Sequence, residues 1–283
     1  MSAGSTTPDS EFVQVNRRLW DGWTELHVGS AFYDVEGFKA GRCTLDQVEL
    51  EGVGDVAGKS LLHLQCHFGL DTLSWARRGA RVVGVDFSGK AVDHARRLAR
   101  ELGIDAHFIQ ADVTDTGTVL SQLAGEQFDV VFTSHGTIVW LSDLRPWART
   151  IAGALKPGGT FFIADSHPFT WMFDETSTEP ALRFRYEYFT RDAFREEVKG
   201  SYAVPDADFQ HDSYCWQHDF GEIVSSLAEA GLTIVSLREC PYLFWKWFPW
   251  MVEDGQGIFR LPEGMPDIPL MFSLQATKTT PQR

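Results

Sequence analysis

The sequence has few cysteines and no long hydrophobic run, and each absence excludes a class of protein. Its four cysteines are scattered over 283 residues and form no CxxC motif, so we expect reduced thiols rather than a disulfide framework. No apolar run is long enough to span a bilayer, and the opening segment MSAGSTTPDSEF lacks a hydrophobic secretion signal. These features predict a cytoplasmic protein without membrane association.

An excess of basic residues is also missing. The formal net charge is −14 and the pI is about 5.0, a balance that repels nucleic acid unless a local basic patch exists. The densest basic pairs, Arg77-Arg78 and Arg96-Arg97, lie in helical patterns with acidic neighbours. We therefore expect a small molecule as the partner and no nucleic acid, while the oligomeric state is left open.

The middle of the chain alternates short apolar runs with amphipathic helical patterns. Strands are predicted at residues 60–65, 81–85, 106–110, 128–133 and 160–164, and helices at 71–78, 88–103, 119–123 and 143–155. This order predicts right-handed βαβ units and a parallel sheet. Because the strands are apolar throughout, the sheet should be covered on both faces.

The flanking regions are less regular. An amphipathic helix is predicted at 12–23, followed by loops or short turns in FYDVEGFKAGR (32–42). After Asp165 aromatic residues are frequent, and the alternation of charge and ring in RFRYEYF (183–189) predicts a strand. A helix at 222–230 and strands at 232–238 and 270–277 complete the order.

A cofactor loop is predicted where the first strand ends. The loop Gln65–Gly69 follows that strand, and Asp86 ends the second strand 21 residues beyond Gln65. A carboxylate at this distance typically binds ribose hydroxyls; the alternative is that Asp86 caps the next helix. Four side chains stand where a dinucleotide pyrophosphate would need glycines, which disfavours NAD or FAD. S-adenosylmethionine contains adenosine but no phosphates, and it tolerates a bulkier loop.

Five segments together resemble the class I S-adenosylmethionine-dependent methyltransferases, in particular a bacterial subgroup that acts on small molecules. They are LLHLQCHFG, VVGVDFS, ADVTD, FDVVFTSHG and LKPGGTFFIAD, which cover about residues 60–166. The resemblance implies a doubly wound, seven-stranded, mostly parallel α/β sheet whose last strand is antiparallel and inserted beside the sixth. It also implies one domain with four parts: an N-terminal helical cap (1–58), a cofactor-binding core (59–168), a lid insertion (169–216) and a final helix and strands (217–283).

The same resemblance implies which residues bind S-adenosylmethionine. Asp112 would accept from the adenine amine, the Val113 amide would face a ring nitrogen, and Phe87 would flank the adenine. The full expected set is Gln65, Cys66, His67, Gly69, Asp86, Phe87, Asp112, Val113 and Ser134. A helix cap is the alternative for Asp112, and simple core packing for Phe87.

The sequence departs from the family at three positions of the first motif. His63 stands where the family usually has an acid that helps hold the methionyl amino group, and Gln65 and His67 replace glycines. The backbone carbonyl of Ser134 is a candidate replacement for the amino-group contact. Either Lys39 or Arg42 could reach the methionyl carboxylate.

Methyl transfer from a sulfonium is an in-line displacement, so catalysis needs mainly positioning and the exclusion of water. A hydroxyl acceptor needs a base more than a neutral amine does. His135, Asp165 and His167 follow the fourth and fifth strands and are the candidate catalytic residues, with a purely structural histidine as the alternative. No metal site is predicted, because the fourth strand ends without an acid, and His211, Cys215 and His218 would need a helix to converge.

Aromatic residues are abundant after strands four and five. Trp140, Phe169, Trp171 and Phe173 suit a pocket for a flat, mostly apolar molecule, although a protein-interaction patch has similar composition. We therefore expect methyl transfer from S-adenosylmethionine to nitrogen or oxygen of a small, partly aromatic metabolite of secondary metabolism. The alternatives are a non-catalytic protein with a degenerate loop and an NAD-type oxidoreductase.

Overall fold

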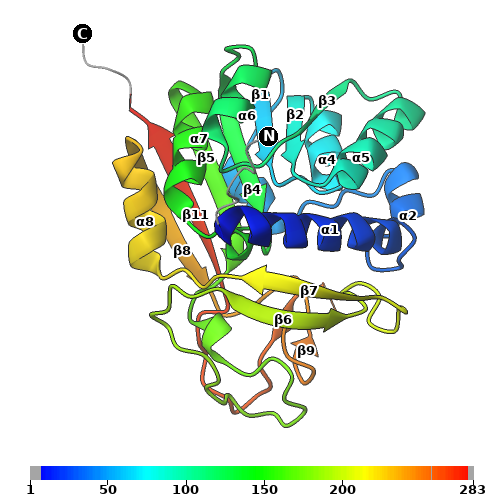
Figure 1. Cartoon of the computed structure of the whole chain (residues 1–283), viewed down its shortest axis with the longest axis vertical. Helices are drawn as coiled ribbons and strands as arrows, with labels where there is room; N and C mark the ends of the chain where they lie inside the picture. The colour runs from blue at the N-terminus through cyan, green and yellow to red at the C-terminus, as the bar shows by residue number, and fades with distance from the viewer. Residues whose placement is uncertain (1–7, 256, 280–283) are drawn as a thin grey trace, which may run out of the picture.

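The computed structural model describes residues 8–255 and 257–279 and consists of one large sheet between two layers of helices, with smaller β elements below it (Figure 1). The strands are β1 (Ser60–Leu64), β2 (Arg81–Asp86), β3 (Ala106–Gln110), β4 (Phe128–Ser134), β5 (Leu155–Ser166), β6 (Phe194–Lys199), β7 (Gln210–Cys215), β8 (Leu232–Cys240), β9 (Val252–Glu253), β10 (Phe259–Arg260) and β11 (Met271–Lys278). The helices are α1 (Pro8–Val28), α2 (Val35–Lys39), α3 (Gln47–Val53), α4 (Leu70–Arg77), α5 (Gly89–Leu102), α6 (Thr116–Gln122), α7 (Leu144–Ala154) and α8 (Phe220–Glu229), with 3₁₀ turns at Ile138–Trp140 and Thr170–Met172.

The large sheet has seven strands in the order β3-β2-β1-β4-β5-β11-β8. The five strands from β3 to β5 are parallel to their neighbours. β11 lies between β5 and β8 and is antiparallel to both. The predicted doubly wound α/β sheet with an inserted antiparallel last strand is therefore confirmed.

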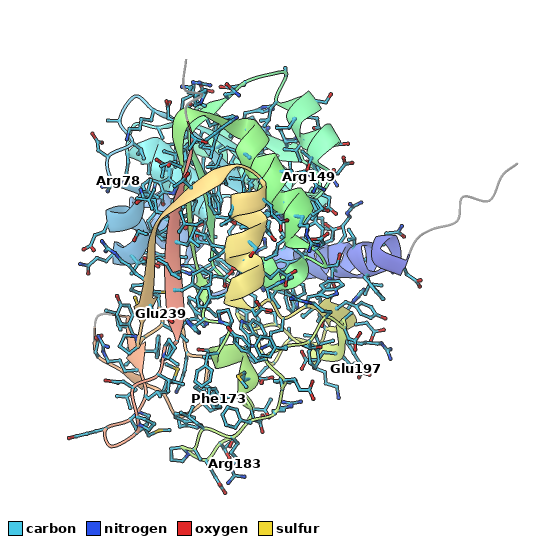
Figure 2. The ribbon with its side chains drawn as sticks, turned by 90° about the vertical axis from the view of Figure 1, so that its left-hand side faces the viewer. Arg78, Arg149, Phe173, Arg183, Glu197 and Glu239 are labelled. Atoms are coloured by element: carbon cyan, nitrogen blue, oxygen red, sulfur yellow. The ribbon has the colours of Figure 1, made fainter. Side chains whose placement is uncertain are left out.

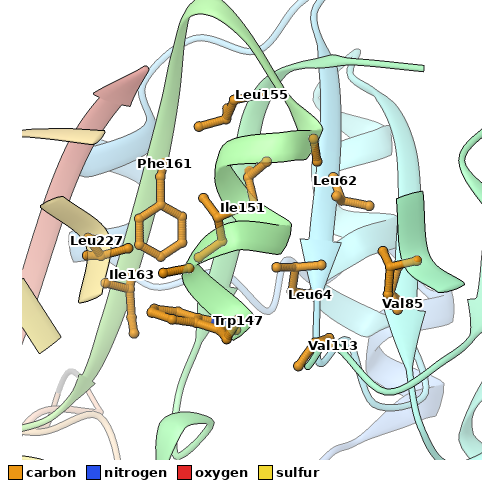
Figure 3. Packing of buried hydrophobic residues seen from close by; sticks show 14 of the residues in the cluster. Leu62, Leu64, Val85, Val113, Trp147, Ile151, Leu155, Phe161, Ile163 and Leu227 are labelled. Atoms are coloured by element: carbon orange, nitrogen blue, oxygen red, sulfur yellow. The ribbon is translucent and has the colours of Figure 1, made fainter. Parts of the chain in front are cut away.

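Alternate residues of each strand pack on opposite faces of the sheet. Leu62 and Leu64 of β1 pack with Trp147, Ile151 and Phe161 on the face covered by α6, α7 and α8 (Figure 3). Leu61 faces the other side, where α4 contributes Trp75 and α3 contributes half-buried apolar residues. Because both faces are covered, the central strands β1, β2 and β4 are buried along nearly their whole length.

Helix α1 and the β6–β7 hairpin lie at the edge of the sheet where the parallel strands end (Figure 1). The hairpin is joined to α1 by Asn16, whose Nδ2 donates to the Tyr214 carbonyl at 2.7 Å and whose Oδ1 accepts from the Tyr214 amide at 2.8 Å. Seen from the side, Phe173, Arg183 and Glu197 mark this lower part of the molecule, while Arg78 and Arg149 lie at the opposite end (Figure 2). Two segments far apart in sequence thus cover the edge where ligands bind in such sheets.

Two predictions about the flanking regions were wrong, and one helix was not predicted. Helix α1 is longer than predicted. Helix α2 lies within 32–42, where loops or short turns were expected, and α3 lies where no element was predicted. Residues 183–189 do not form a strand: Phe184 makes a single bridge with Phe173 and is 68% exposed, and Phe189 is 79% exposed. An alternating pattern forms a strand only when a neighbouring strand pairs with it and a core buries one face. Residues 183–189 have neither.

Among the residues described, no helix combines the length and the apolar character needed to cross a membrane.

Candidate functional site

The loop after β1 keeps a backbone that usually requires glycine. Gln65, His67 and Gly69 all have positive φ angles, of 58°, 50° and 86°. Only Gly69 is also sterically required, because an added Cβ would lie 2.9 Å from the Ala95 Cβ and from the Phe108 ring. Gln65 and His67 therefore add side chains to the loop, but its backbone keeps a left-handed conformation at both positions.

Asp86 connects this loop to the start of α5. Its Oδ2 accepts the His67 amide and its Oδ1 accepts the Ser88 amide, both at 2.8 Å. Burial raises the pKa of Asp86 to about 6, although the Ser88 and His67 amides oppose that shift. The cap of α5 is Ser88, whose Oγ accepts the Ala91 amide at 3.1 Å. Asp86 is thus not the helix cap, and its two oxygens accept amides from the loop and from the start of α5.

The segment after β3 holds the residues expected at the adenine. Asp112 is half-buried, and its Oδ1 accepts from the Thr114 amide at 2.9 Å and hydroxyl at 2.7 Å. The cap of α6 is Asp115, so Asp112 is not the cap either. Val113 is buried and its carbonyl accepts from Thr150 at 2.9 Å. Phe87 is half-buried after β2.

Helix α1 contacts the loop through a histidine pair and a tryptophan. His27 Nδ1 lies 3.0 Å from His67 Nε2, and the Trp20 ring centre lies 5.1 Å from that of His67 and 5.3 Å from that of Trp140. Burial lowers the pKa of His27 to about 4 and that of His67 well below its usual value. Both imidazoles are therefore neutral at pH 7.

His135, directly after β4, lies between two carboxylates that precede β1 in sequence. Its Nε2 is 2.8 Å from Asp46 Oδ2 and 3.4 Å from Glu49 Oε1. Burial alone would lower the pKa of His135, but the Asp46 hydrogen bond and the charge of Glu49 raise it to about 9. The structure thus brings this predicted catalytic residue together with two acids that sequence reasoning missed. In the sequence, the spacing of Asp46 and Glu49 in LDQVE matches a capping box, and this pattern could have indicated a helix start there.

The other two candidate catalytic residues are engaged within the protein. Asp165 accepts the Gly136 amide at 2.7 Å and the Thr137 amide at 2.9 Å, so it holds the loop that follows His135. His167 Nε2 lies 2.7 Å from Glu239 Oε1, and its Nδ1 accepts the Phe169 amide at 2.9 Å.

The remaining predicted positions lie in varied surroundings. His63 is buried in β1, with Nδ1 2.8 Å from the Thr72 hydroxyl, and burial lowers its pKa to about 3. Cys66 is buried in the core beside the loop, where burial raises its pKa. Lys39 pairs with Glu36 and Glu101, and Arg42 pairs with Asp34.

The aromatic residues predicted to line one pocket fall into separate groups. Trp140 packs against Trp20 and Trp23 of α1. Phe169 and Phe173 have ring centres 5.2 Å apart and join a core below the sheet. Trp171 lines a small cavity beside Asp165, together with Trp216 and His218.

Buried polar atoms without a hydrogen-bond partner gather at this edge of the sheet. Of the thirteen such atoms in the part of the chain that the structure describes, seven lie here: Trp20 Nε1, His27 Nε2, Glu49 Oε1, Gln65 Oε1, His67 Nδ1, Ser134 Oγ and His135 Nδ1. Buried polar groups are normally hydrogen-bonded. Such a concentration between α1, the loop and the end of β4 is typical of a site that receives a polar ligand.

Comparison with known proteins agrees with this geometry. Residues 61–159 match the family model described as a methyltransferase domain. Ubiquinone biosynthesis O-methyltransferase of Aeromonas salmonicida (strain A449) is 30% identical over 141 residues, 48% of this chain and 57% of the relative. The enzyme of the same name from Escherichia coli O127:H6 (strain E2348/69 / EPEC) is 29% identical over 162 residues, 55% of this chain and 65% of the relative. The chain therefore spans less than two thirds of the length of these curated relatives.

Solved structures extend the similarity to most of the chain. A putative S-adenosylmethionine dependent methyltransferase from Listeria monocytogenes superposes with a TM-score of 0.55 at 17% identity, covering 81% of this chain and 95% of the other. An S-adenosylmethionine-dependent methyltransferase from Clostridium acetobutylicum ATCC 824 gives 0.54 at 14% identity, covering 93% and 100%. At these identities the likeness shows the fold. Residues 61–159 thus match a methyltransferase domain, and the chain as a whole has the fold of the S-adenosylmethionine-dependent methyltransferases.

Proposed function

We propose that this chain transfers a methyl group from S-adenosylmethionine to nitrogen or oxygen of a small, partly aromatic metabolite. The observation that carries the proposal is the group of unpartnered buried polar atoms around the loop after β1, next to the fixed carboxylate of Asp86. A polar ligand that lies along this edge of the sheet would form hydrogen bonds with the unpartnered atoms and with the Asp86 carboxylate. S-adenosylmethionine, with a ribose, an amine and a carboxylate, has the matching groups.

The adenosine half would lie against the ends of β2 and β3. Asp86 would accept from the ribose hydroxyls, and its backbone hydrogen bonds hold the carboxylate in place for them. Asp112, fixed by Thr114, would accept from the adenine amine, with the Val113 amide and the Phe87 ring beside it. A negative charge at Asp86 would repel a 2′-phosphate.

The methionyl half would lie between the loop, α1 and the end of β4. The side-chain Nε2 of Gln65 donates to the Thr137 carbonyl at 2.8 Å. Its Oε1 has no hydrogen-bond partner among the described residues. This oxygen and the Ser134 carbonyl can accept from an ammonium group in place of the acid missing at His63. The Trp20 indole and the Ser134 hydroxyl can donate to a carboxylate.

The sulfonium supplies an activated methyl group, so the protein's share is mainly to position the acceptor and exclude water. Among the candidate catalytic residues, His135 directly follows β4 and has an unpartnered Nδ1, which would contact the acceptor. Asp165 would act as a positioning residue through the loop it anchors, and His167 would shape the far side of the site. Helix α1 and residues 169–216 would cover the acceptor as a lid.

The acceptor class follows from the relatives and the aromatic residues. The curated relatives are named as O-methyltransferases of ubiquinone biosynthesis, which makes an aromatic hydroxyl the first acceptor class to screen. The rings of Trp140, which packs against Trp20, and of Trp171, which lies beside Asp165, suit flat substrates. A secondary metabolite remains the expected substrate.

Calorimetric titration with S-adenosylhomocysteine and, separately, NAD⁺ tests the cofactor assignment. We expect the wild type to bind S-adenosylhomocysteine alone and Asp86→Ala to lose at least 100-fold in affinity. Asp93→Ala, which removes an exposed carboxylate of α5, is the matched control and should bind like the wild type. Binding of NAD⁺, or equal binding by both variants, would contradict the proposal; no binding by the wild type would favour a non-catalytic protein.

A further inference from the structure

We propose that Asp46, Glu49 and His135 form a binding site for one divalent transition-metal ion. The three candidate ligand atoms, Asp46 Oδ2, Glu49 Oε1 and His135 Nε2, all lie within 4.8 Å of one another. Around an ion with bonds of about 2.1 Å, ligand atoms are spaced roughly 3–3.5 Å apart. The distances from His135 Nε2 to the two oxygens, 2.8 Å and 3.4 Å, are close to that spacing.

The two carboxylates are held by the capping box at the start of α3. Asp46 Oδ1 accepts the Glu49 amide at 2.9 Å, and Glu49 Oε2 accepts the Asp46 amide at 2.8 Å. Each carboxylate thus uses one oxygen to cap the helix and directs the other at His135. Hydrogen bonds of this kind orient the ligands in protein metal sites.

The imidazole is held from the opposite side of the site. His135 follows β4, and the next two residues donate their amides to the buried Asp165 carboxylate at 2.7 Å and 2.9 Å. The Trp245 ring packs with its centre 5.0 Å from that of His135. The three ligands therefore come from two segments that are independently fixed, as a preorganised site requires.

One oxygen in this cluster has no hydrogen bond, although His135 Nε2 lies 3.4 Å from it. Glu49 is 2% exposed, and its Oε1 has no hydrogen-bond partner among the described residues. The neighbouring Ser134, 8% exposed, has an unpartnered hydroxyl as well. A buried carboxylate oxygen without a partner is costly, and a bound cation would remove that cost.

The donor set indicates which ions fit. One imidazole nitrogen with two carboxylate oxygens suits Mn²⁺, Fe²⁺ or Zn²⁺ better than Mg²⁺ or Ca²⁺, which prefer oxygen ligands alone. Three protein ligands leave at least one coordination position for water or another oxygen. If the proposed methyl transfer holds, that position lies at the end of β4, beside the acceptor. The metal site itself stands on these residues alone.

Titration of the metal-free, tag-free chain with MnCl₂ and with ZnCl₂ tests the site. We expect one ion per chain, with at least tenfold weaker binding in Glu49→Gln, which keeps the size of the side chain and an oxygen for the capping box. The matched control is Glu239→Gln, which also removes a carboxylate beside a histidine, His167, and should bind like the wild type.

His135→Gln provides a second variant, with circular dichroism spectra and melting temperatures of all variants measured alongside. Loss of the ion in both cluster variants, with intact spectra, would support the site. No ion in the wild type, or equal binding in Glu49→Gln, would overturn it and leave the three side chains as a hydrogen-bonded ion cluster. Because binding of S-adenosylhomocysteine is measured separately, failure of the metal site is distinguishable from failure of the proposed function.

Discussion

Two histidine clusters flank the loop after β1, and they differ in charge. On the α1 side, formed by Trp20, His27 and His67, burial without an acidic partner keeps both imidazoles neutral. On the α3 side, formed by Asp46, Glu49 and His135, two carboxylates raise the pKa of an imidazole that burial alone would lower. The same residue type thus provides neutral hydrogen-bonding groups on one side and a charged cluster on the other, according to its neighbours alone.

The strongest test of the α1 side removes the ring that holds the helix over the loop. Trp23 is 5% exposed, packs against Trp20 and Trp140, and donates to the Gly200 carbonyl at 2.8 Å. We expect Trp23→Ala to lower the free energy of unfolding by about 3–5 kcal/mol, measured by urea denaturation. Phe32→Ala, at a side chain that is 54% exposed, should change it far less; equal losses would mean that α1 contributes no more than surface packing.

The charge state of the α1 side predicts a pH dependence of stability. Burial lowers the pKa of His27 to about 4 in the folded chain, from 6.5 for an ordinary histidine, so the unfolded chain binds a proton first as the pH falls. Its contribution is therefore fully present above pH 6.5 and is lost between pH 6.5 and 4, on the order of 3 kcal/mol. Unfolding of His27→Gln should show a weaker dependence in that window. The exposed His107→Gln is the control, and an unchanged profile in His27→Gln would contradict the assignment.

A smaller effect is expected from the hydrogen bonds that hold the α3 side. The Thr44 hydroxyl donates to Asp71 and lies 2.9 Å from the Ser74 hydroxyl. Thr44→Val leaves the half-buried Asp71 carboxylate without this donor and should cost about 1.5–2 kcal/mol of unfolding free energy. Thr44→Ser keeps the hydroxyl and should recover most of the loss in the same thermal melts; similar losses in both variants would point to packing instead.

The smallest expected effect is on ligand affinity. Asp86 has a pKa of about 6, so its carboxylate is ionised at pH 7 and mostly protonated at pH 5. Binding of S-adenosylhomocysteine should weaken about tenfold between these values, or about 1.4 kcal/mol. Asp86→Asn should bind weakly at both. If the affinity of Asp86→Asn still changed tenfold between pH 7 and pH 5, the titrating group would be another residue. The same measurement on His27→Gln would then show whether that group is His27.

Much of the sheet was predictable because it depends on local patterns. The predicted ranges of β1, β2 and β3 agree with the structure to within one residue at each end, since apolar runs bounded by turns specify buried strands. Helix α3 was missed because it is short and has a half-apolar pattern. Its stability comes from the capping box of Asp46 and Glu49, which the pattern of apolar residues does not register.

The site was less predictable because its main contacts join distant residues. Asp86 could be found because its spacing from the loop is set by one βα unit. The partners of His135 lie 89 and 86 residues away, and no local pattern relates them. The loop was hard to interpret for another reason. Gln65 and His67 adopt backbone angles that favour glycine, so residue identity alone gave no sign that the loop conformation is kept.

The position of β11 has a consequence for synthesis of the chain. A ribosome that has completed residue 270 has made every other strand of the large sheet, yet the neighbours β5 and β8 have no strand between them. Until residues 271–278 emerge, β5 and β8 present unpaired edges that could pair with other chains. The nascent protein therefore stays vulnerable to aggregation until β11 has been made, and protection by chaperones would matter most before that point.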